Sequence, residues 1–466
     1  MFQPHRCFGS SALLFRSVAW AGIVCFCGSA QPAAAAGQRI ATFRVDVTPP
    51  LGSPLVGGWV APLLAVDDPL WAKGIVLEDG GRRYVLCAVD YCEIRNSSHT
   101  FFREQLAAAA GTDPSRVAVQ TLHQHTAPMI DEPAQALVDA TAKSLPITDM
   151  SHFRQAVADT AAAVRQAVER LEPYDGLTTG AAEVERFASN RRVMGDDGKI
   201  KVRYSATKDP DLQAAPEGLV DRRLRTITFL SGTRPLVRLH YYATHPQSFY
   251  GDGRATCDTV GLARERLEQE EGVPQIYFTG CGGDVTAGKY NDGSPQSRRD
   301  LTDRLAAGMR AAIAASRPVA LGPIQWRVTP LTLAPRLDEP YTLSAARQQL
   351  ENVNESPTQR IIKGAMLLAW IERQQTPIEL SSLSIGPVTI VHLPGEPFIV
   401  YQLLAQKLGG ERFVAVAGYG DCGCGYLCTE ASYAEGGYEP TASFVGPRSQ
   451  YALEDAIGRL VPNEEK

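Results

Sequence analysis

The chain has 466 residues, 44% of them hydrophobic and 21% charged, which is enough material for a globular protein with a large core. The net charge is -5 and no basic run stands out, so nucleic acid is excluded as an expected partner. No stretch after the first forty residues is long and apolar enough to cross a membrane.

The first 36 residues have the pattern of a secretory signal peptide. Arg6 and Arg16 supply its positive charge, and residues 17–30 form an apolar stretch too short to span a bilayer comfortably. Three alanines at positions 34–36 then offer a small-residue cleavage site. An uncleaved membrane anchor is the alternative. We therefore expect a secreted or periplasmic protein in which residues 37–466 form a single domain.

An odd number of cysteines follows the expected signal peptide, so at least one is unpaired or pairs with a cysteine of another chain. The three that cluster near the C-terminus could bind a metal. We expect a disulfide among them instead, because an exported protein meets oxidising conditions. The seven are Cys87, Cys92, Cys257, Cys281, Cys422, Cys424 and Cys428.

Strand and helix patterns alternate through the first 170 residues, which predicts an α/β fold. We expect a large, mixed, twisted β-sheet with helices packed on it and a metal site at the strand ends. Asp90 follows a hairpin that turns at Gly80 and Gly81, and it is either a functional carboxylate or a loop cap. The expected strands are 39–47, 74–77, 84–89 and 117–122, and the expected helices are 96–110 and 150–171.

Strand and helix patterns also follow one another through the rest of the chain. Residues 280–285 are rich in glycine, which lets the backbone approach a neighbour closely, and Asp284 should orient a neighbour or cap that loop. A helical pair within residues 341–375 is expected to be an excursion from the sheet. The further strands expected are 176–187, 224–230, 236–242, 275–278, 324–333, 383–385, 388–393 and 413–417, with helices at 260–271, 297–316, 343–353, 358–373 and 398–408.

Two histidines follow the strand that begins at Val117. His123 and His125 are two residues apart, so on a strand their side chains share one face. Two imidazoles on one face can share a metal, or one can bind it while the other handles protons. A hydrogen-bonded structural pair is the commoner meaning of this motif when it stands alone.

Polar residues at the ends of other strands are candidates to bind the same metal as these two histidines. His245 follows the strand at 236–242, and Glu396 lies between a strand end and a helix start, where the helix dipole favours an ionised carboxylate. Two histidines and one carboxylate are a common catalytic zinc ligand set. Zinc lowers the pKa of its water to about 7, so the pattern predicts hydrolysis of an amide or ester. The late tyrosines Tyr433 and Tyr438 are candidates to pack on a rim, ligate a metal or donate to an oxyanion.

Several ordered segments resemble the neutral/alkaline, non-lysosomal ceramidases. Residues 123–128, His-Gln-His-Thr-Ala-Pro, are similar to the family's His-Thr-His-Ser-Gly-Pro signature. Gly425-Tyr426, with Tyr438 twelve residues later, resembles its closing Gly-Tyr-Val-Thr-Thr segment. The other segments that follow in family order are 43–50, Asn190-Arg191, Ala243-Thr244-His245, Gly283-Asp284-Val285 and Gly395-Glu396-Pro397.

This resemblance implies a zinc-dependent amidase that cleaves the N-acyl bond of ceramide by attack of metal-bound hydroxide. Its partner would be a lipid or small-molecule amide, with peripheral contact to a membrane surface as a further expectation. His125 and Tyr438 would stabilise the oxyanion or pass its proton, and Arg191 would lie near the substrate's polar head. The zinc ligands implied are His123, His245, Glu396 and Tyr426.

The chain also departs from the ceramidase pattern. Gln124 and Ala127 replace Thr and Gly in the histidine signature, and residues 427–429 are Leu-Cys-Thr rather than Val-Thr-Thr. About 28 residues follow Tyr438, so we expect no C-terminal immunoglobulin-like domain, and residues 341–375 would be an insertion. Metal chemistry is therefore better supported than ceramide specificity. The alternatives are a zinc esterase or peptidase acting on a small polar substrate, and a non-catalytic surface binding protein that kept the fold.

Overall fold

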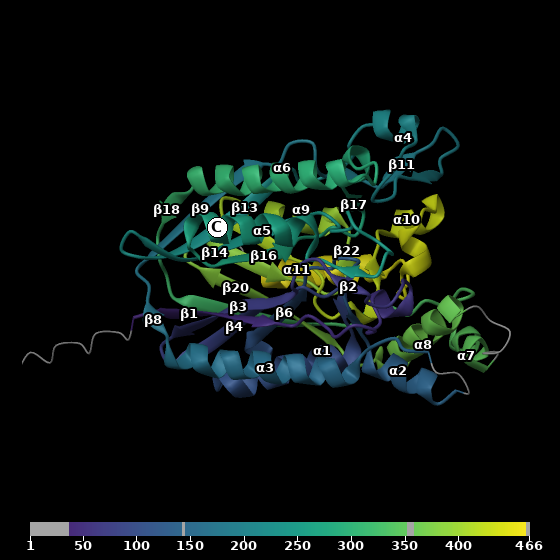
Figure 1. Cartoon of the computed structure of the whole chain (residues 1–466), viewed down its shortest axis with the longest axis horizontal. Helices are drawn as coiled ribbons and strands as arrows, with labels where there is room; N and C mark the ends of the chain where they lie inside the picture. Colours follow the sequence, from purple (N-terminus) through teal and green to yellow (C-terminus); the bar gives the residue numbers. More distant parts are fainter. Residues whose placement is uncertain (1–36, 142–144, 352–357, 463–466) are drawn as a thin grey trace, which may run out of the picture. The chain divides into compact units, whose positions relative to one another are not determined.

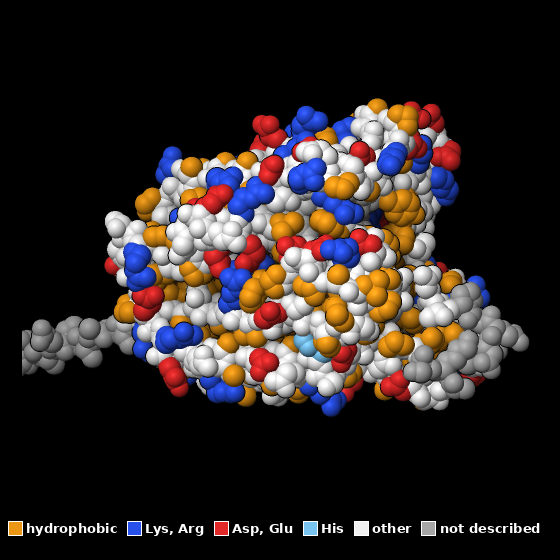
Figure 2. Space-filling model, in the orientation of Figure 1, with side chains coloured by type: hydrophobic (Ala, Val, Ile, Leu, Met, Phe, Trp, Pro, Cys, Tyr) orange, Lys and Arg blue, Asp and Glu red, His pale blue; other side chains and the backbone are white. Residues whose placement is uncertain are grey.

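The computed structural model describes residues 37–141, 145–351 and 358–462. The expected signal peptide lies outside these ranges, as does the connection between the two helices of the expected insertion. Within the described ranges, no helix is both long and apolar enough to cross a membrane. On the face shown in Figure 2, acidic and basic side chains are intermingled, and no continuous basic surface suited to nucleic acid is visible there.

The N-terminal part of the chain builds the first sheet. Its strands, in spatial order, are β6 (Val117–Thr121), β4 (Arg82–Val89), β3 (Trp71–Asp79), β1 (Arg39–Asp46) and β8 (Glu172–Pro173). β3 and β4 form the expected hairpin, and Gly80 and Gly81 have φ values of 55° and 76°, as the central residues of a type I′ turn require. β4 and β6 are parallel, and α1 (Asn96–Ala110) connects them.

Strand alternation gives this sheet two buried faces. Val76, Val85 and Cys87 lie in the core formed with α1 and α3 (Met150–Glu169). Their neighbours Ile75 and Leu86 lie in a second core, shared with the second sheet. Because both faces are buried, β3 carries no charge from residue 74 to 77 and β4 carries none from residue 84 to 89, as expected of strands covered on both sides.

The second sheet has the order β16-β14-β13-β9-β18. α5 (Asp258–Glu271) and α6 (Pro295–Ala314) cover it, so helices form the outer layers and the two sheets the inner ones (Figure 1). β14 and β16 are parallel, with α5 between them in sequence. The strands are β9 (Gly176–Glu183), β13 (Arg223–Ser231), β14 (Arg234–Tyr242), β16 (Gln275–Thr279) and β18 (Arg317–Val319).

A third sheet contains β19 (Ile324–Leu331), β20 (Ile378–Ile385), β21 (Val388–His392) and β23 (Phe413–Ala417), in that spatial order. α9 (Ile399–Leu408) and α11 (Ser449–Leu460) pack on it, and α11 was not predicted. The expected helical pair is present as α7 (Leu343–Glu351) and α8 (Thr358–Arg373), between β19 and β20. The α/β class with mixed sheets is confirmed, and the strands divide among three larger sheets rather than forming one.

Short elements connect these layers, and several of them were not predicted from the sequence. Among them, β22 pairs in parallel with β24, and β5 pairs in parallel with β7, near the ends of the longer strands. The bounds are η1 Val56–Gly58, β2 Ala65–Val66, β5 Glu93–Ile94, η2 Pro114–Arg116, β7 Met129–Ile130, α2 Glu132–Asp139, β10 Ser189–Asn190, β11 Arg192–Met194, β12 Ile200–Val202, α4 Pro210–Ala214, β15 Arg254–Ala255, β17 Val285–Thr286, η3 Gly288–Tyr290, β22 Glu396–Pro397, η4 Cys422–Cys424, β24 Tyr426–Leu427, α10 Glu430–Glu435 and η5 Glu439–Ala442.

Asp90 has a structural role. Both carboxylate oxygens accept hydrogen bonds from the Arg264 guanidinium at 2.8 Å, and one also accepts from the Trp71 backbone N–H. Asp90 and Arg264 are fully buried, so each charge depends on the other. These contacts agree with the loop-cap alternative for Asp90. The Asp90 carboxylate does not reach the histidines.

The cysteines differ from expectation. All seven in the described ranges are buried free thiols, so the expected disulfide among Cys422, Cys424 and Cys428 is wrong. Burial raises the pKa of the Cys422 thiol well above its usual range, which disfavours the thiolate that disulfide exchange or metal binding requires. The local pattern Cys-x-Cys-x3-Cys indicated proximity in sequence, but not the orientation of the sulfur atoms.

Candidate metal centre

His123 follows β6 but is not part of it. The strand ends at Thr121, and His123 has a φ of 71°, in the left-handed region that non-glycine residues seldom adopt. The expected alternation of His123 and His125 on one strand face is therefore wrong, because the backbone turns between them. Its Nδ1 lies 2.9 Å from the Cys92 carbonyl oxygen, which directs Nε2 the other way, towards His245. Strained backbone of this kind clusters at functional sites.

His245 approaches from the second sheet, just past β14. Its backbone N–H donates to the Val285 carbonyl at 2.7 Å, and its Nδ1 lies 3.0 Å from the Gly282 carbonyl oxygen. A side chain at Gly282 would meet the Thr244 backbone at 2.8 Å, so glycine is what allows this close approach. The prediction that the glycine-rich loop meets a neighbour closely agrees with these distances. Asp284 in the same loop accepts from the Ile399 N–H at 2.7 Å and so caps α9.

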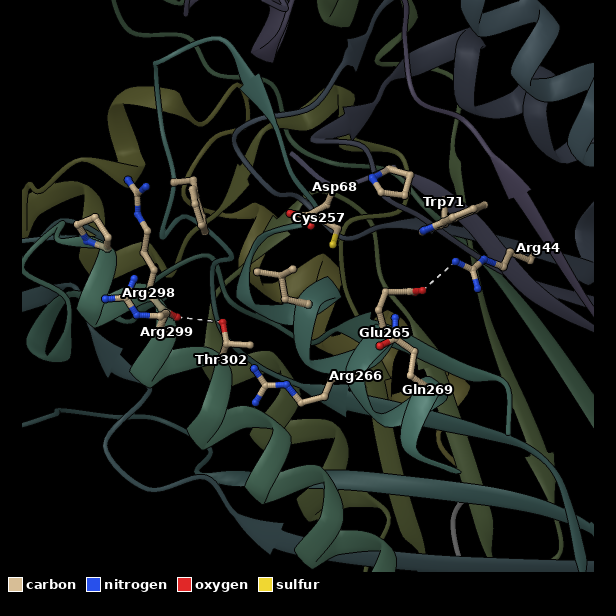
Figure 3. A pocket seen from close by; sticks show the side chains of 14 residues that line it. Arg44, Asp68, Trp71, Cys257, Glu265, Arg266, Gln269, Arg298, Arg299 and Thr302 are labelled. Atoms are coloured by element: carbon tan, nitrogen blue, oxygen red, sulfur yellow. Dashed lines mark hydrogen bonds and ion pairs between the residues drawn. The ribbon is translucent and has the colours of Figure 1, made fainter. Parts of the chain in front are cut away.

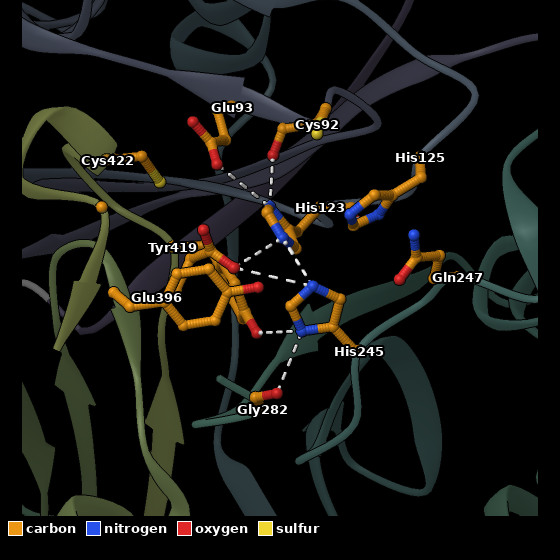
Figure 4. Close-up of polar contacts among 12 residues, drawn as sticks. Cys92, Glu93, His123, His125, His245, Gln247, Gly282, Glu396, Tyr419 and Cys422 are labelled. Carbon is orange, nitrogen blue, oxygen red and sulfur yellow. Dashed lines mark hydrogen bonds and ion pairs between the residues drawn. The ribbon is translucent and has the colours of Figure 1, made fainter. Parts of the chain in front are cut away.

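Glu396 comes from the third part of the chain, in β22. Its Oε2 lies 3.0 Å from His123 Nε2 and 3.6 Å from His245 Nε2, and Figure 4 shows the three side chains facing one another. This buried oxygen accepts no hydrogen bond from the described residues. Gly283 N–H donates to the Pro397 carbonyl at 2.9 Å, which ties β22 to the glycine loop. Three distant segments therefore converge on one point.

The donor set fits a bound cation. A carbonyl oxygen can only accept, so Nδ1 carries the proton on both His123 and His245, and the two Nε2 atoms present lone pairs to each other at 3.0 Å. The unpaired Oε2 of Glu396 faces the same point. Three electron-rich atoms so placed repel one another unless a positive charge lies between them. Zn²⁺ takes imidazole and carboxylate ligands of this kind, and carbonyls that hold the other ring nitrogen are their usual support.

The pKa shifts of these side chains point to the same need for positive charge. Burial lowers the pKa of His123, but the Glu396 carboxylate and Cys92 together outweigh burial, and the pKa lies well above its usual range. Burial raises the pKa of Glu396, but His123, Tyr426 and Arg191 together outweigh burial, and the pKa lies below its usual range. Burial, followed by Arg191, holds the pKa of His245 well below its usual range, so His245 stays neutral as a metal ligand must.

The remaining predicted site residues surround this point. His125 Nδ1 lies 3.0 Å from the His123 carbonyl oxygen, and a ring nitrogen of His125 lies within 4.8 Å of those of His123 and His245. Arg191 Nη1 donates to the Tyr426 hydroxyl at 3.1 Å. The ring of Tyr438 packs edge-on against Tyr426, with centroids 5.8 Å apart. Tyr433 lies apart from these residues, because its hydroxyl bonds to Ser443 and Val445.

Three residues of the site were not predicted. Glu93 Oε1 lies 3.8 Å from His123 Nδ1, and Glu93 is paired with Arg95. Tyr419 stacks on the His123 ring at 4.4 Å, with its hydroxyl 3.4 Å from His245 Nδ1. The signals available in the sequence were two opposite charges on either side of Ile94, and a tyrosine between glycines 418 and 420.

A cavity of about 350 Å³ opens beside these side chains. His123, His125 and Glu396 form its polar end, together with Arg191, Tyr426 and Tyr438. Its volume lies within the range of pockets that bind small ligands. The apolar part of its wall consists of Val56, Trp59, Met129, Met366 and Phe444.

A larger cavity, of about 590 Å³, lies elsewhere, between β1, α5 and α6 (Figure 3). None of the predicted site residues lines it. Arg44, which lies 3.6 Å above the Trp71 ring, is paired there with Glu265 and Glu268, and Arg266 is paired with Asp303. The paired charges make this cavity a less favourable place for hydrolytic chemistry than the smaller cavity beside the histidines.

No protein-family model and no curated protein matches this chain in sequence. Its fold, however, is similar to solved structures. The neutral ceramidase from Pseudomonas aeruginosa aligns with a TM-score of 0.69 and 18% identity, over 91% of this chain and 74% of that one. A ceramidase complexed with C2 aligns with a TM-score of 0.67 and 17% identity, over 91% and 75% of the two chains. The chain therefore has the fold of neutral ceramidases.

Proposed function

We propose that this protein is an exported zinc-dependent hydrolase that cleaves an amide bond, with ceramide or another N-acyl lipid as substrate. One observation carries the proposal: His123 Nε2, His245 Nε2 and Glu396 Oε2 converge within 3.6 Å beside a cavity. Two histidines and one carboxylate recur as the ligands of catalytic zinc. The ceramidase fold supports the same class of reaction.

Four residues would hold the metal: His123, His245, Glu396 and Tyr426. When bound, Zn²⁺ lowers the pKa of a coordinated water to about 7 and polarises a carbonyl oxygen. The backbone carbonyls of Cys92 and Gly282 keep the two imidazoles in the tautomer that leaves Nε2 free for ligation. Arg191, which donates to the Tyr426 hydroxyl at 3.1 Å, stabilises negative charge on that oxygen.

His125 and Tyr438 are the groups that we assign to proton transfer and oxyanion stabilisation. His125 holds Nδ1 3.0 Å from the His123 carbonyl oxygen, and burial lowers the pKa of His125 well below its usual range, so the ring stays neutral and is suited to accept a proton from the attacking water. Burial raises the pKa of Tyr438, so its hydroxyl stays protonated and can donate to the oxygen that becomes negative. Both side chains line the cavity, which places them within reach of a bound substrate.

The cavity wall supports a substrate with an acyl chain. Trp59, Met129 and Met366 contribute flexible or aromatic apolar surface next to the polar end of the cavity. An exported enzyme would find such amides in or beside lipid, which accords with peripheral contact to a membrane surface. Tyr204 and Tyr250, both about half exposed, lie at the cavity and provide amphipathic surface for that contact.

Release of fatty acid from a panel of N-acyl amides tests the proposal. Purified mature protein is assayed on ceramides, N-acyl ethanolamines and N-acyl amino acids, with ester analogues in parallel. We expect amide cleavage that a chelator abolishes and added zinc restores. Cleavage that persists after complete removal of metal would refute zinc dependence. Turnover of the esters alone would replace the amidase by an esterase, and binding without turnover would favour a non-catalytic binding protein.

A further inference from the structure

Arg95 is a buried cation in the cavity wall beside the histidines. It is 6% exposed, and its Nε donates to Glu93. Glu93 and Arg95 flank Ile94 in an extended segment at β5, so alternation directs both side chains to the cavity. Arg95 Nη1 is buried and has no hydrogen-bond partner among the described residues. A buried donor without an acceptor is costly, so an acceptor on a bound ligand would stabilise it.

Lys363 adds a second cation from α8. Lys363 and Met366 are three residues apart, on one face of the helix, and both line the cavity. Lys363 Nζ donates to the Thr441 carbonyl at 2.5 Å, and an ammonium has three protons to donate. α8 lies within the expected insertion, so this cation belongs to the region where the chain departs most from the ceramidase pattern.

The charges around the cavity do not balance. Arg95, Arg191 and Lys363 line it, against Glu93 and Glu396. Glu396 faces the two Nε2 atoms and would serve the bound metal, and Arg191 is paired with the buried Glu439 at 3.7 Å, which leaves Glu93 to offset Arg95 and Lys363. This excess of positive charge occurs in a chain whose net charge is -5. We propose that the site selects N-acyl amides whose amine half carries an anionic group, such as the carboxylate of an N-acyl amino acid.

The position of Arg95 specifies where that anionic group lies. Glu93 Oε1 is 3.8 Å from His123 Nδ1, and the other Glu93 oxygen meets Arg95, so a single carboxylate separates the guanidinium from the candidate metal ligand. A substrate whose anionic group lies close to the scissile amide could therefore place that group near Arg95 while the amide lies near the metal ligands. In an N-acyl amino acid the carboxylate is one carbon from the amide nitrogen. Ceramide presents neutral hydroxyl groups there, and charge-assisted hydrogen bonds are about twice as strong as neutral ones.

This inference rests on the proposed amide hydrolysis and is tested with matched substrates. N-dodecanoylglycine and N-dodecanoylglycinamide share the acyl chain and differ in charge, and dodecanoic acid release measures both. We expect kcat/KM to be about tenfold or more higher for the carboxylate. Equal values, or a preference for the neutral amide, would overturn the proposal.

Two variants test whether Lys363 and Arg95 cause the preference for the carboxylate substrate. Lys363→Met keeps a side chain of similar length, and Arg95→Lys keeps the charge that Glu93 needs while it removes the planar donor pair. We expect each to reduce the preference about threefold or more without loss of zinc. The control is Lys407→Met, an exposed residue of α9 outside the cavity, which should retain the preference. An unchanged preference in both cavity variants would contradict the assignment.

Binding measurements with analogues that are not hydrolysed test anion selection separately from the proposed amide hydrolysis. The sulfonamide analogues N-(dodecylsulfonyl)glycine and its carboxamide are not hydrolysed, and calorimetry with the zinc-loaded protein measures their affinities directly. Tighter binding of the carboxylate, weakened by Lys363→Met, supports anion selection even if no amide is cleaved, in which case the amidase proposal fails alone. Equal binding of the two analogues, together with turnover of both amides, would overturn anion selection alone.

Discussion

His123 Nε2 and His245 Nε2 lie 3.0 Å apart, although the residues are separated by 122 positions in the chain. Each imidazole uses its other nitrogen to contact a backbone carbonyl, that of Cys92 or Gly282. The two free nitrogens therefore face each other across a distance at which lone pairs repel. With Glu396 Oε2 beside them, this pair defines the place where the proposed cation would bind and could activate water.

His123→Ala should remove the metal. It deletes one of the converging ligand atoms and opens the site to solvent, so we expect about one zinc per chain in the unmodified protein and little in the variant. Mass spectrometric metal analysis of the purified proteins measures this. His152→Ala is the control, because that ring contacts Val47 and Tyr91 and lies away from the cavity. Equal zinc in the two variants would argue against His123 as a ligand.

Tyr438→Phe should slow turnover without loss of metal. The hydroxyl lies at the cavity, and loss of one oxyanion donor typically lowers kcat about 10²- to 10³-fold. Steady-state kinetics and zinc content are measured together. Tyr433→Phe is the matched control, since that hydroxyl bonds to Ser443 and Val445 instead. If both variants retain full kcat, Tyr438 takes no part in catalysis.

Arg264→Met should destabilise the fold. It leaves the Asp90 carboxylate buried without its bidentate partner, and such a loss costs about 3–5 kcal/mol in the free energy of unfolding. Urea denaturation measures the change. Arg310→Met removes an exposed pair with Glu270 and should cost at most about 1 kcal/mol. A similar small cost at both positions would show that the Asp90 pair contributes little.

Asp131→Asn should change how stability depends on pH. Burial raises the pKa of Asp131 from 3.8 to about 6, so between these values the folded protein holds a proton that the unfolded chain releases. The free energy of unfolding therefore falls as pH rises from about 4 to 6, by about 1.4 kcal/mol per pH unit at most. The variant lacks this loss, and it should gain stability relative to the parent over that window. Urea titrations at pH 4 and pH 6.5 measure the difference, and a constant difference would refute the assignment.

Much of the secondary structure could be predicted from local pattern. The hairpin at Gly80 and Gly81, the helix ended by Gly111 and the strand before His245 all depend on residues within a few positions of one another. Turn glycines, caps and side-chain periodicity act over that range. The division into three sheets could not be predicted in this way, because the lateral partner of a strand depends on how distant segments pack.

The candidate site was predictable in part for the same reason. Polar residues after apolar strands marked His123, His245 and Glu396, and the structure brings all three together. The shared strand face of His123 and His125 was wrong, because a single left-handed residue redirects the backbone. Asp90 had the same sequence signal as His245, but its place in the fold pairs it with Arg264.

The sequence by itself determined the elements, the glycine turns and which side chains stand where strands end. Only the tertiary structure decided which of these side chains meet and which of their atoms are free. His123 Nε2 is available for a ligand because Cys92, 31 residues away, holds Nδ1. Arg95 lines the cavity, and its Nη1 has no acceptor among the described residues, whereas its Nε donates to Glu93. The physical reason is the distance along the chain over which each effect acts. Secondary-structure propensity depends on residues that are neighbours in sequence, whereas metal ligation, burial and unpaired charge depend on contacts between segments far apart in the chain.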